Sequence, residues 1–388
     1  MRIRKQVKQK VSLLKAMPLG VVLPALIMCT TGVFFIYSAS TDFELLAEGL
    51  SNARGYHTRQ IAFAILGFTI MIGVALMPQR WLSKYWLLWL FVGVGLLGAV
   101  LVFGRTINGA KSWIALGPVN LQPSELCKPL LVIALAGYLR YHQTVDTART
   151  FGVTLLIAGM FLGPIMLQPD LGTAMVFIPV LGAMIYVAGG NKLYLAGMGF
   201  CGLTVIPAAY VFDILKPHQM KRIEIYLSSL SGEVADRTGD GYHILQSMVA
   251  IGSGGVWGKG YGQGSQSQLS FLPERHTDFI FSVVAEEMGL MGVAVFVFVL
   301  FWMLKSMLGV AANAKEPFAR LVVVGVATLF FAQAAINIGV VSGVVPVTGI
   351  TLPMVSYGGS SLLSAFISLG LVCNVAVQPQ RVMGRATF

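Results

Sequence analysis

The stretch FLPERHTDFIF, residues 271–281, contains the densest group of ionisable side chains in the sequence: Glu274, Arg275, His276 and Asp278. An almost entirely apolar segment follows it. A carboxylate partly withdrawn from water has a raised pKa, which suits removal of a proton from a hydroxyl group. Neighbouring cations suit an anionic substrate such as a phosphate or pyrophosphate. The stretch is therefore a candidate active site.

The same residues also have a plain structural explanation. Thr277 can cap a helix that begins here, and Asp278 can interact favourably with its positive N-terminus. Glu286 and Glu287 follow, but on a continuous helix Glu286 lies about 12 Å of rise from Asp278. That is farther than the roughly 5–9.5 Å between the paired carboxyl groups of a glycoside hydrolase. Chemistry at Asp278 therefore needs a single carboxylate, or a partner from another helix such as Glu125.

A second group of candidate residues lies in NGAKSWIALGPVNLQPSELCKP, residues 108–129. Pro123 suits a first helical turn, so Glu125 and Lys128 are three residues apart on one helix face. A capped helix start with a surface ion pair explains this pattern. Against that explanation, a long apolar run follows Lys128 and places the lysine near lipid depth. Trp113 fits an interfacial anchor.

Two further motifs combine polar residues with breaks in apolar segments. In QPDLGT, residues 168–173, we favour a turn with an acidic residue at the start of a helix. In residues 344–364, two prolines and a Gly-Gly pair interrupt an apolar region. Broken backbone is tolerated at membrane depth only where protein or a water-filled cavity surrounds it. A packing kink and a loop lining a polar cavity are the two interpretations.

The amino-acid composition indicates whether the chain folds in water or in a membrane. Of 388 residues, 56% are hydrophobic and 11% are charged, against about 25% charged in soluble domains. We therefore predict a polytopic, all-α integral membrane protein. The net charge of +11 does not indicate a nucleic-acid partner, because the basic residues are scattered rather than gathered on one soluble domain. The four cysteines show no CxxC spacing, so neither a zinc site nor a disulfide framework is expected.

About ten membrane helices are expected in a single domain, residues 1–388. A bilayer core needs about 20 apolar residues per helix. The candidate spans are residues 17–38, 58–77, 85–104, 124–141, 150–167, 171–189, 193–212, 278–305, 317–341 and 354–377. With a cytoplasmic N-terminus, 16 of the 27 Lys and Arg residues lie on the cytoplasmic side. Both termini are then cytoplasmic, and all four motifs lie on the extracytoplasmic face.

The connection between the seventh and eighth spans, residues 213–277, is a large extracytoplasmic loop. Apolar residues at helical spacing in 242–251 predict an amphipathic helix on the membrane or the bundle. Seven glycines follow within residues 252–264. This run is not a phosphate-binding loop, because Ser253 replaces a required glycine and Gly260 follows Lys259. It predicts a flexible loop with close backbone approach.

Taken alone, the residues indicate a membrane enzyme or transporter acting on an amphiphilic anion at one extracytoplasmic cavity. The segments KSWIALGPVNLQPSE, QPDLGTA, FLPERHTDFIFSVVAEEMG and LPMVSYGGSS resemble the signatures of the SEDS family, the shape, elongation, division and sporulation proteins. The resemblance covers nearly the whole chain. Within the family, GSQSQLSFLPERHTDF and the short termini are similar to the elongation members rather than the division members.

The resemblance implies a peptidoglycan glycosyltransferase in the bacterial cytoplasmic (inner) membrane. Such enzymes polymerise lipid II, a disaccharide-pentapeptide on undecaprenyl pyrophosphate, into β-1,4 glycan strands. The matching catalytic position is Asp278, which would deprotonate the 4-hydroxyl of the acceptor. Lys128 and Arg275 would face the pyrophosphate. The implied substrate-binding positions are Trp113, Glu125, Lys128, Arg275, Thr277 and Ser356.

The implied partners are lipid II, the growing lipid-linked strand, membrane lipids and a class B penicillin-binding protein of the elongation machinery. Some family members respond to divalent cations such as Mg or Mn. This sequence has no ligand cluster with diagnostic spacing, so a metal requirement is left open. The competing interpretations are a transporter or flippase of lipid-linked precursors, a division-type homologue and a non-enzymatic scaffold. A transporter needs charges along a path to both faces, whereas the polar motifs here fall on one face.

Overall fold

The structure is a computed structural model that describes residues 16–41, 55–107, 110–117, 119–142, 145–211, 220, 223–226, 240–268 and 274–378. The main helices of the bundle are α2 (Leu19–Ser40), α4 (Tyr56–Leu76), α6 (Trp86–Phe103), α7 (Pro123–Leu139), α8 (Ala148–Leu167), α9 (Leu171–Val187), α10 (Lys192–Val211), α14 (Ile280–Asn313), α15 (Pro317–Val341) and α16 (Gly359–Val377). Shorter helices are α5 (Gln79–Lys84), α12 (Asp240–Ser253) and α13 (Ser265–Gln268).

Each of the ten predicted spans coincides with one helix of the bundle. Within the described residues, seven helices are long and apolar enough to cross a membrane: α2, α4, α6, α8, α14, α15 and α16. Helix α9 is apolar but shorter. The polytopic, helical membrane fold is therefore confirmed, while the exact number of crossings and the single-domain boundary stay predictions.

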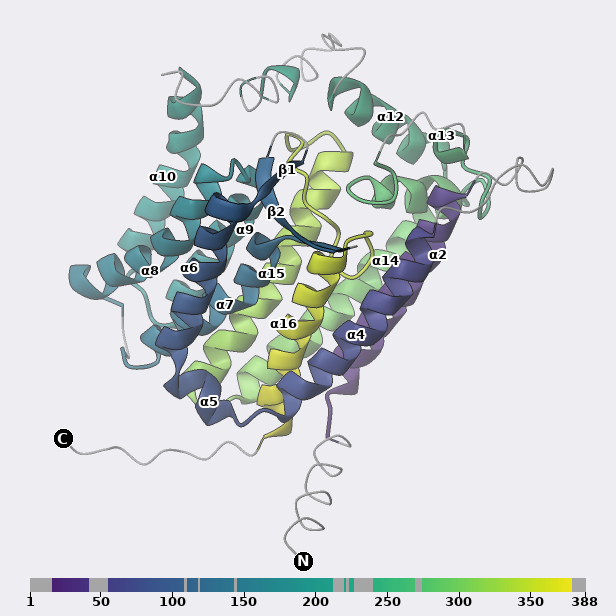
Figure 1. The fold of residues 1–388 in the computed structure, drawn as a ribbon. Coiled ribbons are helices and arrows are strands. Elements are labelled where there is room, and N and C mark those ends of the chain that lie inside the picture. Colours follow the sequence, from purple (N-terminus) through teal and green to yellow (C-terminus); the bar gives the residue numbers. More distant parts are fainter. Residues whose placement is uncertain are drawn as a thin grey trace, which may run out of the picture.

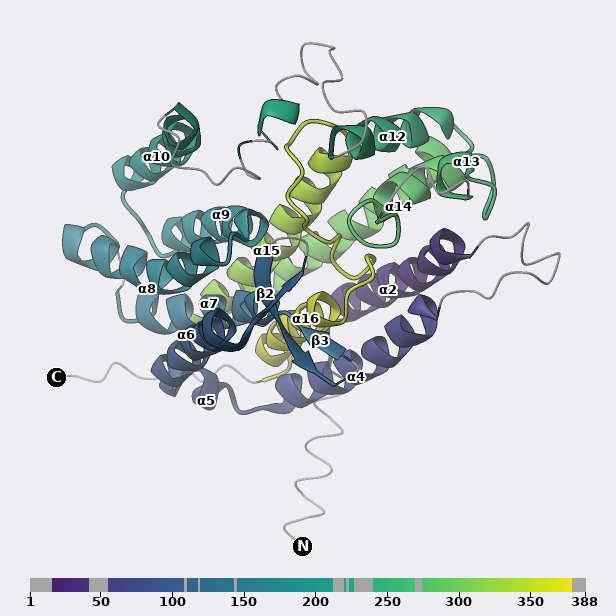
Figure 2. The same ribbon diagram turned by 45° about the horizontal axis from the view of Figure 1, so that its top comes forward.

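The centre of the bundle is formed by α15 and α16. Helix α15 packs against α7, α9 and α14, and α16 packs against α4 and α7 (Figures 1 and 2). Most of the apolar stretch of these two helices is buried inside the protein, whereas only 22% of that of α4 and of α6 is buried. Exposed apolar surface on α4 and α6 is what a lipid-facing helix requires, because lipid replaces protein as its apolar surroundings.

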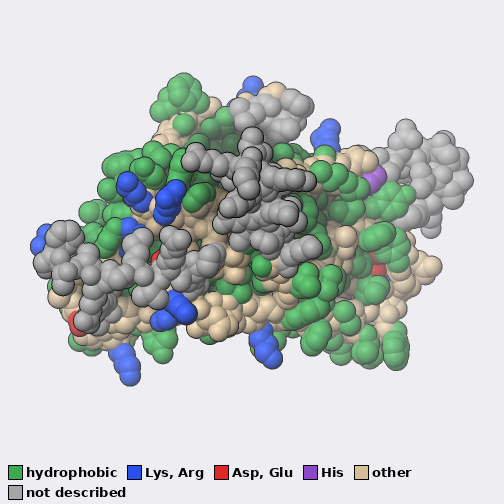
Figure 3. All heavy atoms as spheres, turned by 90° about the horizontal axis from the view of Figure 1, so that it is seen from below, with side chains coloured by type: hydrophobic (Ala, Val, Ile, Leu, Met, Phe, Trp, Pro, Cys, Tyr) green, Lys and Arg blue, Asp and Glu red, His purple; other side chains and the backbone are tan. Residues whose placement is uncertain are grey.

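The two ends of the bundle differ in what they contain. The start of α2, helix α5 and the end of α16 lie at one end, and α12 and α13 lie at the other (Figure 1). Seen from the first end, Lys and Arg side chains are scattered over the rim and the face of the molecule (Figure 3). At this end the buried Asn374 donates through Nδ2 to the carbonyl oxygens of Val74 and Ala75, at 2.9 and 3.2 Å. That clamp joins the end of α16 to the end of α4.

The connection between α6 and α7 forms a small antiparallel sheet that the all-α prediction missed. Its strands are β1 (Arg105–Ile107), β2 (Ala110–Leu116) and β3 (Val119–Leu121), in the order β1-β2-β3. The sequence carried a signal for it, since Asn108-Gly109 is a pair typical of two-residue hairpin turns. Lys111 anchors β2 by donating through Nζ to the carbonyl of Leu101 at 2.8 Å.

Helix α12 confirms the amphipathic helix predicted at residues 242–251, and it packs on α14 and α15. Its buried Ser247 hydroxyl is 2.6 Å from the hydroxyl of Ser282 and donates to the carbonyl of Val341 at 2.7 Å. The helix therefore lies on the bundle. Residues 212–219, 221–222, 227–239 and 269–273 of the predicted loop lie outside the described residues.

Helix α14 is broken at Gly289, and the glycine-rich segment 254–262 fills the break. Gly289 has φ +64° and ψ −166°, a conformation open only to glycine. Four backbone hydrogen bonds join the two segments, from Lys259 to Glu286, Gly260 to Glu287, Leu290 to Gly255 and Met291 to Val256. A Cβ added at Gly258 would stand 2.2 Å from the carbonyl oxygen of Glu287. The predicted close backbone approach is confirmed.

Side-chain contacts tie this glycine-rich segment and α14 to each other and to α2. The Glu286 carboxylate accepts from Lys259 Nζ at 2.7 Å, and Glu287 accepts from the Ser38 hydroxyl at 2.5 Å. The Tyr261 hydroxyl donates to the carbonyl of Phe34 at 2.7 Å. Burial, followed by the charge of Glu287, raises the pKa of Tyr261 to about 12. Glu286 is therefore engaged with the loop, and is not a second carboxylate for Asp278.

We expect Gly289→Ala to lower the free energy of unfolding by about 2–4 kcal/mol, since φ strain and overpacking act together. The new Cβ would stand 2.3 Å from the backbone nitrogen of Gly258. Gly98→Ala in α6 is the control, because no described atom lies within 4 Å of its added Cβ. It should be neutral or slightly stabilising. Thermal unfolding in detergent measures both, and equal midpoints would contradict the role of the break.

Candidate active site

Asp278 lies in the turns that lead into α14, and the structure corrects how that helix begins. Phe279 occupies the N-cap position without a side-chain capping bond, and the first helical residue is Ile280. The Thr277 hydroxyl instead donates to the carbonyl oxygen of Glu274 at 3.0 Å and to its carboxylate at 3.1 Å. The prediction that Thr277 caps the helix is therefore wrong, because residues 278 and 279 still belong to the turn before the helix starts. The half-buried Asp278 and Arg275 belong to these turns.

The loop between α15 and α16 lies beside the Asp278 carboxylate. A Cβ added at Gly349 would stand 3.7 Å from Asp278 Oδ2. Gly349 has φ +71°, so glycine satisfies the backbone here and also leaves the space beside the carboxylate free of a side chain. The buried Asn337 of α15 donates to the carbonyl oxygens of Asp278 and Ile350.

The same loop is held by polar contacts within the protein. The Ser356 hydroxyl accepts from the backbone nitrogen of Leu352 at 2.8 Å. Gln60 of α4, fully buried, donates to the carbonyl of Ser356 at 3.1 Å and accepts from the nitrogen of Gly358. These bonds supply the partners that a broken backbone needs away from water. Helix α16 begins at Gly359, five residues later than predicted, because residues 354–358 belong to this loop.

An aromatic cluster borders this region. His276 stacks on Tyr56 with ring centroids 4.5 Å apart, and Tyr357 meets Tyr56 edge-on at 5.0 Å. The backbone nitrogen of Tyr357 donates to the carbonyl of His276 at 2.9 Å. The cluster ties α4 and the α15–α16 loop to the turns that carry Asp278.

Asp170 confirms the interpretation of the QPDLGT motif as a turn with an acidic residue at a helix start, and it adds a link to α7. It is the N-cap of α9, and its Oδ1 accepts from the backbone nitrogen of Thr173 at 3.0 Å. Its Oδ2 accepts from the hydroxyl of Ser124 at 2.9 Å. A capping carboxylate of this kind stabilises the helix start by about 1 kcal/mol. Here it also joins the QPDLGT and PSELCK motifs.

Glu125 and Lys128 form the predicted pair on one face of α7, with Nζ and Oε1 2.7 Å apart. The surface interpretation of the pair is wrong, since the side chains are 9% and 1% exposed. The second carboxylate oxygen of Glu125 is buried, and none of the described residues forms a hydrogen bond to it. The Ser364 hydroxyl of α16 donates to the carbonyl of Glu125 at 2.7 Å. The pair is thus a buried ionic group between α7 and α16.

Direct contacts connect the four motifs. Ser124 bonds Asp170, a Cβ added at Gly172 would stand 2.5 Å from the carbonyl oxygen of Thr348, and Gly349 faces Asp278. The order of contact is α7, α9, the α15–α16 loop and the start of α14. The half-buried Trp113 lies on β2, opposite Arg105 of β1. β3 approaches α16, where the Ser360 hydroxyl accepts from the backbone nitrogen of Gln122, the residue after β3, at 2.9 Å.

A metal requirement stays open. Within the part of the chain that the structure describes, no group of three or more His, Cys, Asp or Glu side chains is arranged to hold an ion.

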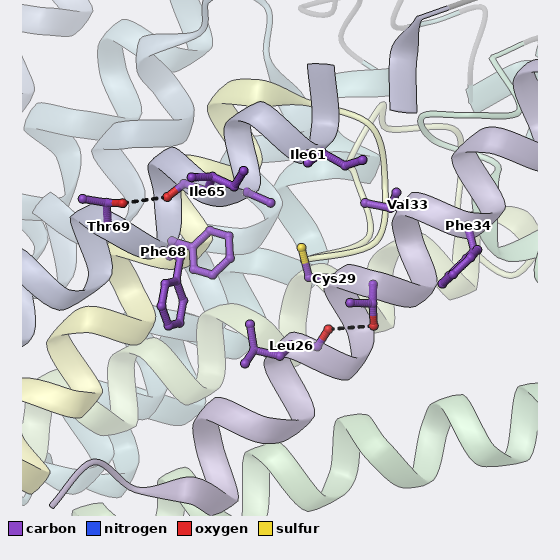
Figure 4. Close-up of a pocket in the computed structure, with 11 residues that line it drawn as sticks. Leu26, Cys29, Val33, Phe34, Ile61, Ile65, Phe68 and Thr69 are labelled. Atoms are coloured by element: carbon purple, nitrogen blue, oxygen red, sulfur yellow. Dashed lines mark hydrogen bonds between the residues drawn. The ribbon is translucent and has the colours of Figure 1, made fainter. Parts of the chain in front are cut away.

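An apolar cavity of about 450 Å³ lies between α2 and α4, with Phe366 of α16 at its wall (Figure 4). The hydroxyls of Thr30 and Thr69 in its lining donate to carbonyl groups of their own helices. Its other lining residues are Leu26, Cys29, Val33, Phe34, Ile61, Ala64, Ile65 and Phe68. The lining suits a hydrocarbon chain rather than a sugar or a pyrophosphate. None of these residues belongs to the four motifs.

Known proteins match this chain over nearly its whole length. A family model covering the FtsW, RodA and SpoVE proteins, described as cell cycle protein, matches residues 20–381. The probable peptidoglycan glycosyltransferase FtsW of Thiomicrospira cyclica is 36% identical over 377 residues, which cover 95% of this chain and 94% of that protein. The peptidoglycan glycosyltransferase MrdB of Escherichia coli K12 is 36% identical over 345 residues, covering 88% and 90%.

Solved structures of related proteins have a similar fold over 92% of this chain. A chain from a peptidoglycan synthase complex aligns with a TM-score of 0.76 and 30% identity, covering 92% of this chain and 96% of that one. The rod shape determining protein RodA of Thermus thermophilus aligns with a TM-score of 0.67 and 29% identity over the same shares.

The bundle of apolar helices, with buried carboxylates and cations joined near one end, together with these matches, defines a polytopic membrane glycosyltransferase. The chain belongs to the SEDS family, the group of FtsW, RodA and SpoVE proteins. The family and enzyme class expected from the four motifs are therefore confirmed.

Three contributors to this site were missed from the sequence: Gln60, Asn337 and Tyr56. Asn337 interrupts an apolar run, and a polar residue at membrane depth is a functional candidate by default. Gln60 gave no such signal, because it directly follows the polar residues His57, Thr58 and Arg59. Tyr56 carried no comparable signal, because its contact with His276 joins residues far apart in the chain.

Proposed function

We propose that this protein polymerises lipid II into β-1,4 glycan strands on the extracytoplasmic face of the bacterial inner membrane, for cell elongation. The observation that carries the proposal is the position of Asp278. Its carboxylate lies beside Gly349 of the α15–α16 loop. This loop contacts Gly172 of α9, and Asp170 at the start of α9 bonds Ser124, the residue before Glu125 of the buried Glu125–Lys128 pair. A chain of contacts thus connects all four family motifs, and it ends at one carboxylate just before a membrane helix.

In the proposed reaction, Asp278 accepts the proton of the 4-hydroxyl of the acceptor lipid II. That oxygen forms a bond to the anomeric carbon of the growing strand. The bond from this carbon to the pyrophosphate oxygen breaks, and undecaprenyl pyrophosphate leaves with the electron pair. Attack from the opposite face inverts the anomeric centre to the β configuration. Asp278 then releases its proton to solvent.

The remaining predicted site residues are assigned to the substrate. Arg275 and Lys128 oppose the charge that grows on the leaving pyrophosphate, and Glu125 orients Lys128. Because Lys128 is buried, direct contact requires the substrate to displace the residues that cover it. The half-buried Trp113, the Thr277 hydroxyl and Ser356 are assigned to positioning the sugars.

The elongation role rests on the amino-acid sequence of residues 264–279, which resembles that of RodA rather than that of FtsW. Relatives bearing both kinds of name are 36% identical to this chain. Depletion in the native cell separates the roles, since loss of an elongation enzyme gives round cells and loss of a division enzyme gives filaments.

We assign the partner as a class B penicillin-binding protein, a transpeptidase that cross-links the new strand. The support is structural similarity to a chain from a peptidoglycan synthase complex. Cytoplasmic termini are supported by the 16 of 27 Lys and Arg residues assigned to that side.

The deciding experiment gives the purified full chain lipid II in vesicles, with no other polymerase present. We expect polymer that forms equally with and without moenomycin, which inhibits the unrelated classical glycosyltransferases. The matched control omits the protein. Movement of lipid II across the vesicle membrane without polymer would contradict the proposal and favour a transporter.

A further inference from the structure

One buried amide contacts both segments that meet at Asp278. Asn337, four residues before the end of α15, is 1% exposed. Its Nδ2 donates to the carbonyl oxygen of Asp278 at 2.8 Å and to that of Ile350 at 2.7 Å. An amide nitrogen carries two hydrogens, so both donors are used. Among the described residues none donates to its Oδ1, so the side chain acts here as a pair of donors.

The two carbonyl groups that accept from Asn337 belong to two segments that lie beside the Asp278 carboxylate. One is the backbone of Asp278 itself, just before α14 begins. The other belongs to Ile350, which follows Gly349, the residue that faces Asp278 Oδ2. A single side chain therefore fixes the base and the loop residue beside it in relation to each other. Helix α15 is among the most buried helices of the bundle, so the amide is mounted on a rigid support.

We infer that Asn337 is a positioning residue for glycosyl transfer, which sets where the Asp278 carboxylate meets the acceptor hydroxyl. The inference rests on the proposed function, in which Asp278 is the base. A misplacement of about 1 Å can cost about a hundredfold in rate. Because Asn337 acts through Asp278 and touches no substrate, its loss lowers kcat and leaves KM nearly unchanged.

The chain offers a matched control in Asn374 of α16. This residue is also buried, and its Nδ2 donates to the backbone carbonyls of Val74 and Ala75. It lies at the end of α16, whereas the loop beside Asp278 precedes the start of that helix. Asn374→Leu removes the same kind of bond as Asn337→Leu, away from the reacting groups.

The test compares wild type, Asn337→Leu, Asn337→Ser and Asn374→Leu as purified full chains, measuring kcat and KM for lipid II and the thermal unfolding midpoint. Leucine has a similar size and no donor, so we expect kcat to fall about 10–100-fold with KM within about threefold. Serine keeps one donor and should give an intermediate kcat. Asn374→Leu should lower the midpoint and retain kcat.

A kcat for Asn337→Leu within about twofold of wild type would overturn the inference, and so would an equal loss in Asn374→Leu. If Asn337→Leu does not fold, Asn337→Ser decides. A reduced kcat at wild-type KM then supports the inference, and an unchanged kcat overturns it. A wild type that makes no polymer would instead overturn the proposed function.

Discussion

Asp278→Asn should fold normally and lose polymerisation by about 100-fold or more, the range of a general base. Asparagine has the same shape but cannot accept the proton of the acceptor hydroxyl. The backbone carbonyl of residue 278, which accepts from Asn337, is unchanged by the substitution. The thermal unfolding midpoint should therefore stay close to that of the wild type, while the initial rate of lipid II polymerisation falls.

Asp146→Asn is the matched control for Asp278→Asn. Asp146 is an exposed carboxylate in the connection between α7 and α8, which is assigned to the cytoplasmic side. It should keep full activity. If Asp278→Asn retained more than about a tenth of the wild-type rate, Asp278 would no longer be the base, since general-base catalysis contributes more than that. A low rate with a collapsed unfolding midpoint would also count against the assignment.

Lys128→Met should have two separate effects, one on stability and one on activity. It leaves the Glu125 carboxylate buried without its cation, and breaking a buried pair in this way costs about 3–5 kcal/mol. It also removes the charge assigned to the pyrophosphate, so polymerisation should be lost. Thermal unfolding and initial rates measure the two effects.

The double variant Glu125→Gln with Lys128→Met separates these effects. A neutral pair in the same place removes the buried charge, so stability should return close to that of the wild type. Activity should remain lost, because the cation is still missing. If the double variant regained the wild-type rate, the pair would be structural and the pyrophosphate assignment of Lys128 would be wrong.

The parts of the fold that could be predicted depend on interactions close in sequence. Apolar runs located the helices because the lipid and the protein interior both exclude unpaired backbone groups. Helix spacing gave the pair of Glu125 and Lys128, and a capping carboxylate three residues before Thr173 gave the start of α9. Each of these signals acts within about one helical turn.

The features that were missed depend on contacts between distant segments. The start of α14 was misplaced because Thr277 bonds back to Glu274 rather than forward into the helix. Residues 354–358 were assigned to a helix because the sequence does not show that buried Gln60, almost 300 residues away, supplies their hydrogen bonds. The burial of Lys128 likewise follows from how neighbouring helices cover α7.

The two ends of the bundle close at different stages of synthesis. The break at Gly289 is completed by residues 255–260, which leave the ribosome shortly before it, so this contact can form as soon as α14 is made. The Asn374 clamp joins residues 300 positions apart and must wait for α16, the last helix. Helix α4 therefore stays without its main packing partner until synthesis is almost finished. A nascent chain that stops before residue 359 has its first helices in the membrane but no completed bundle.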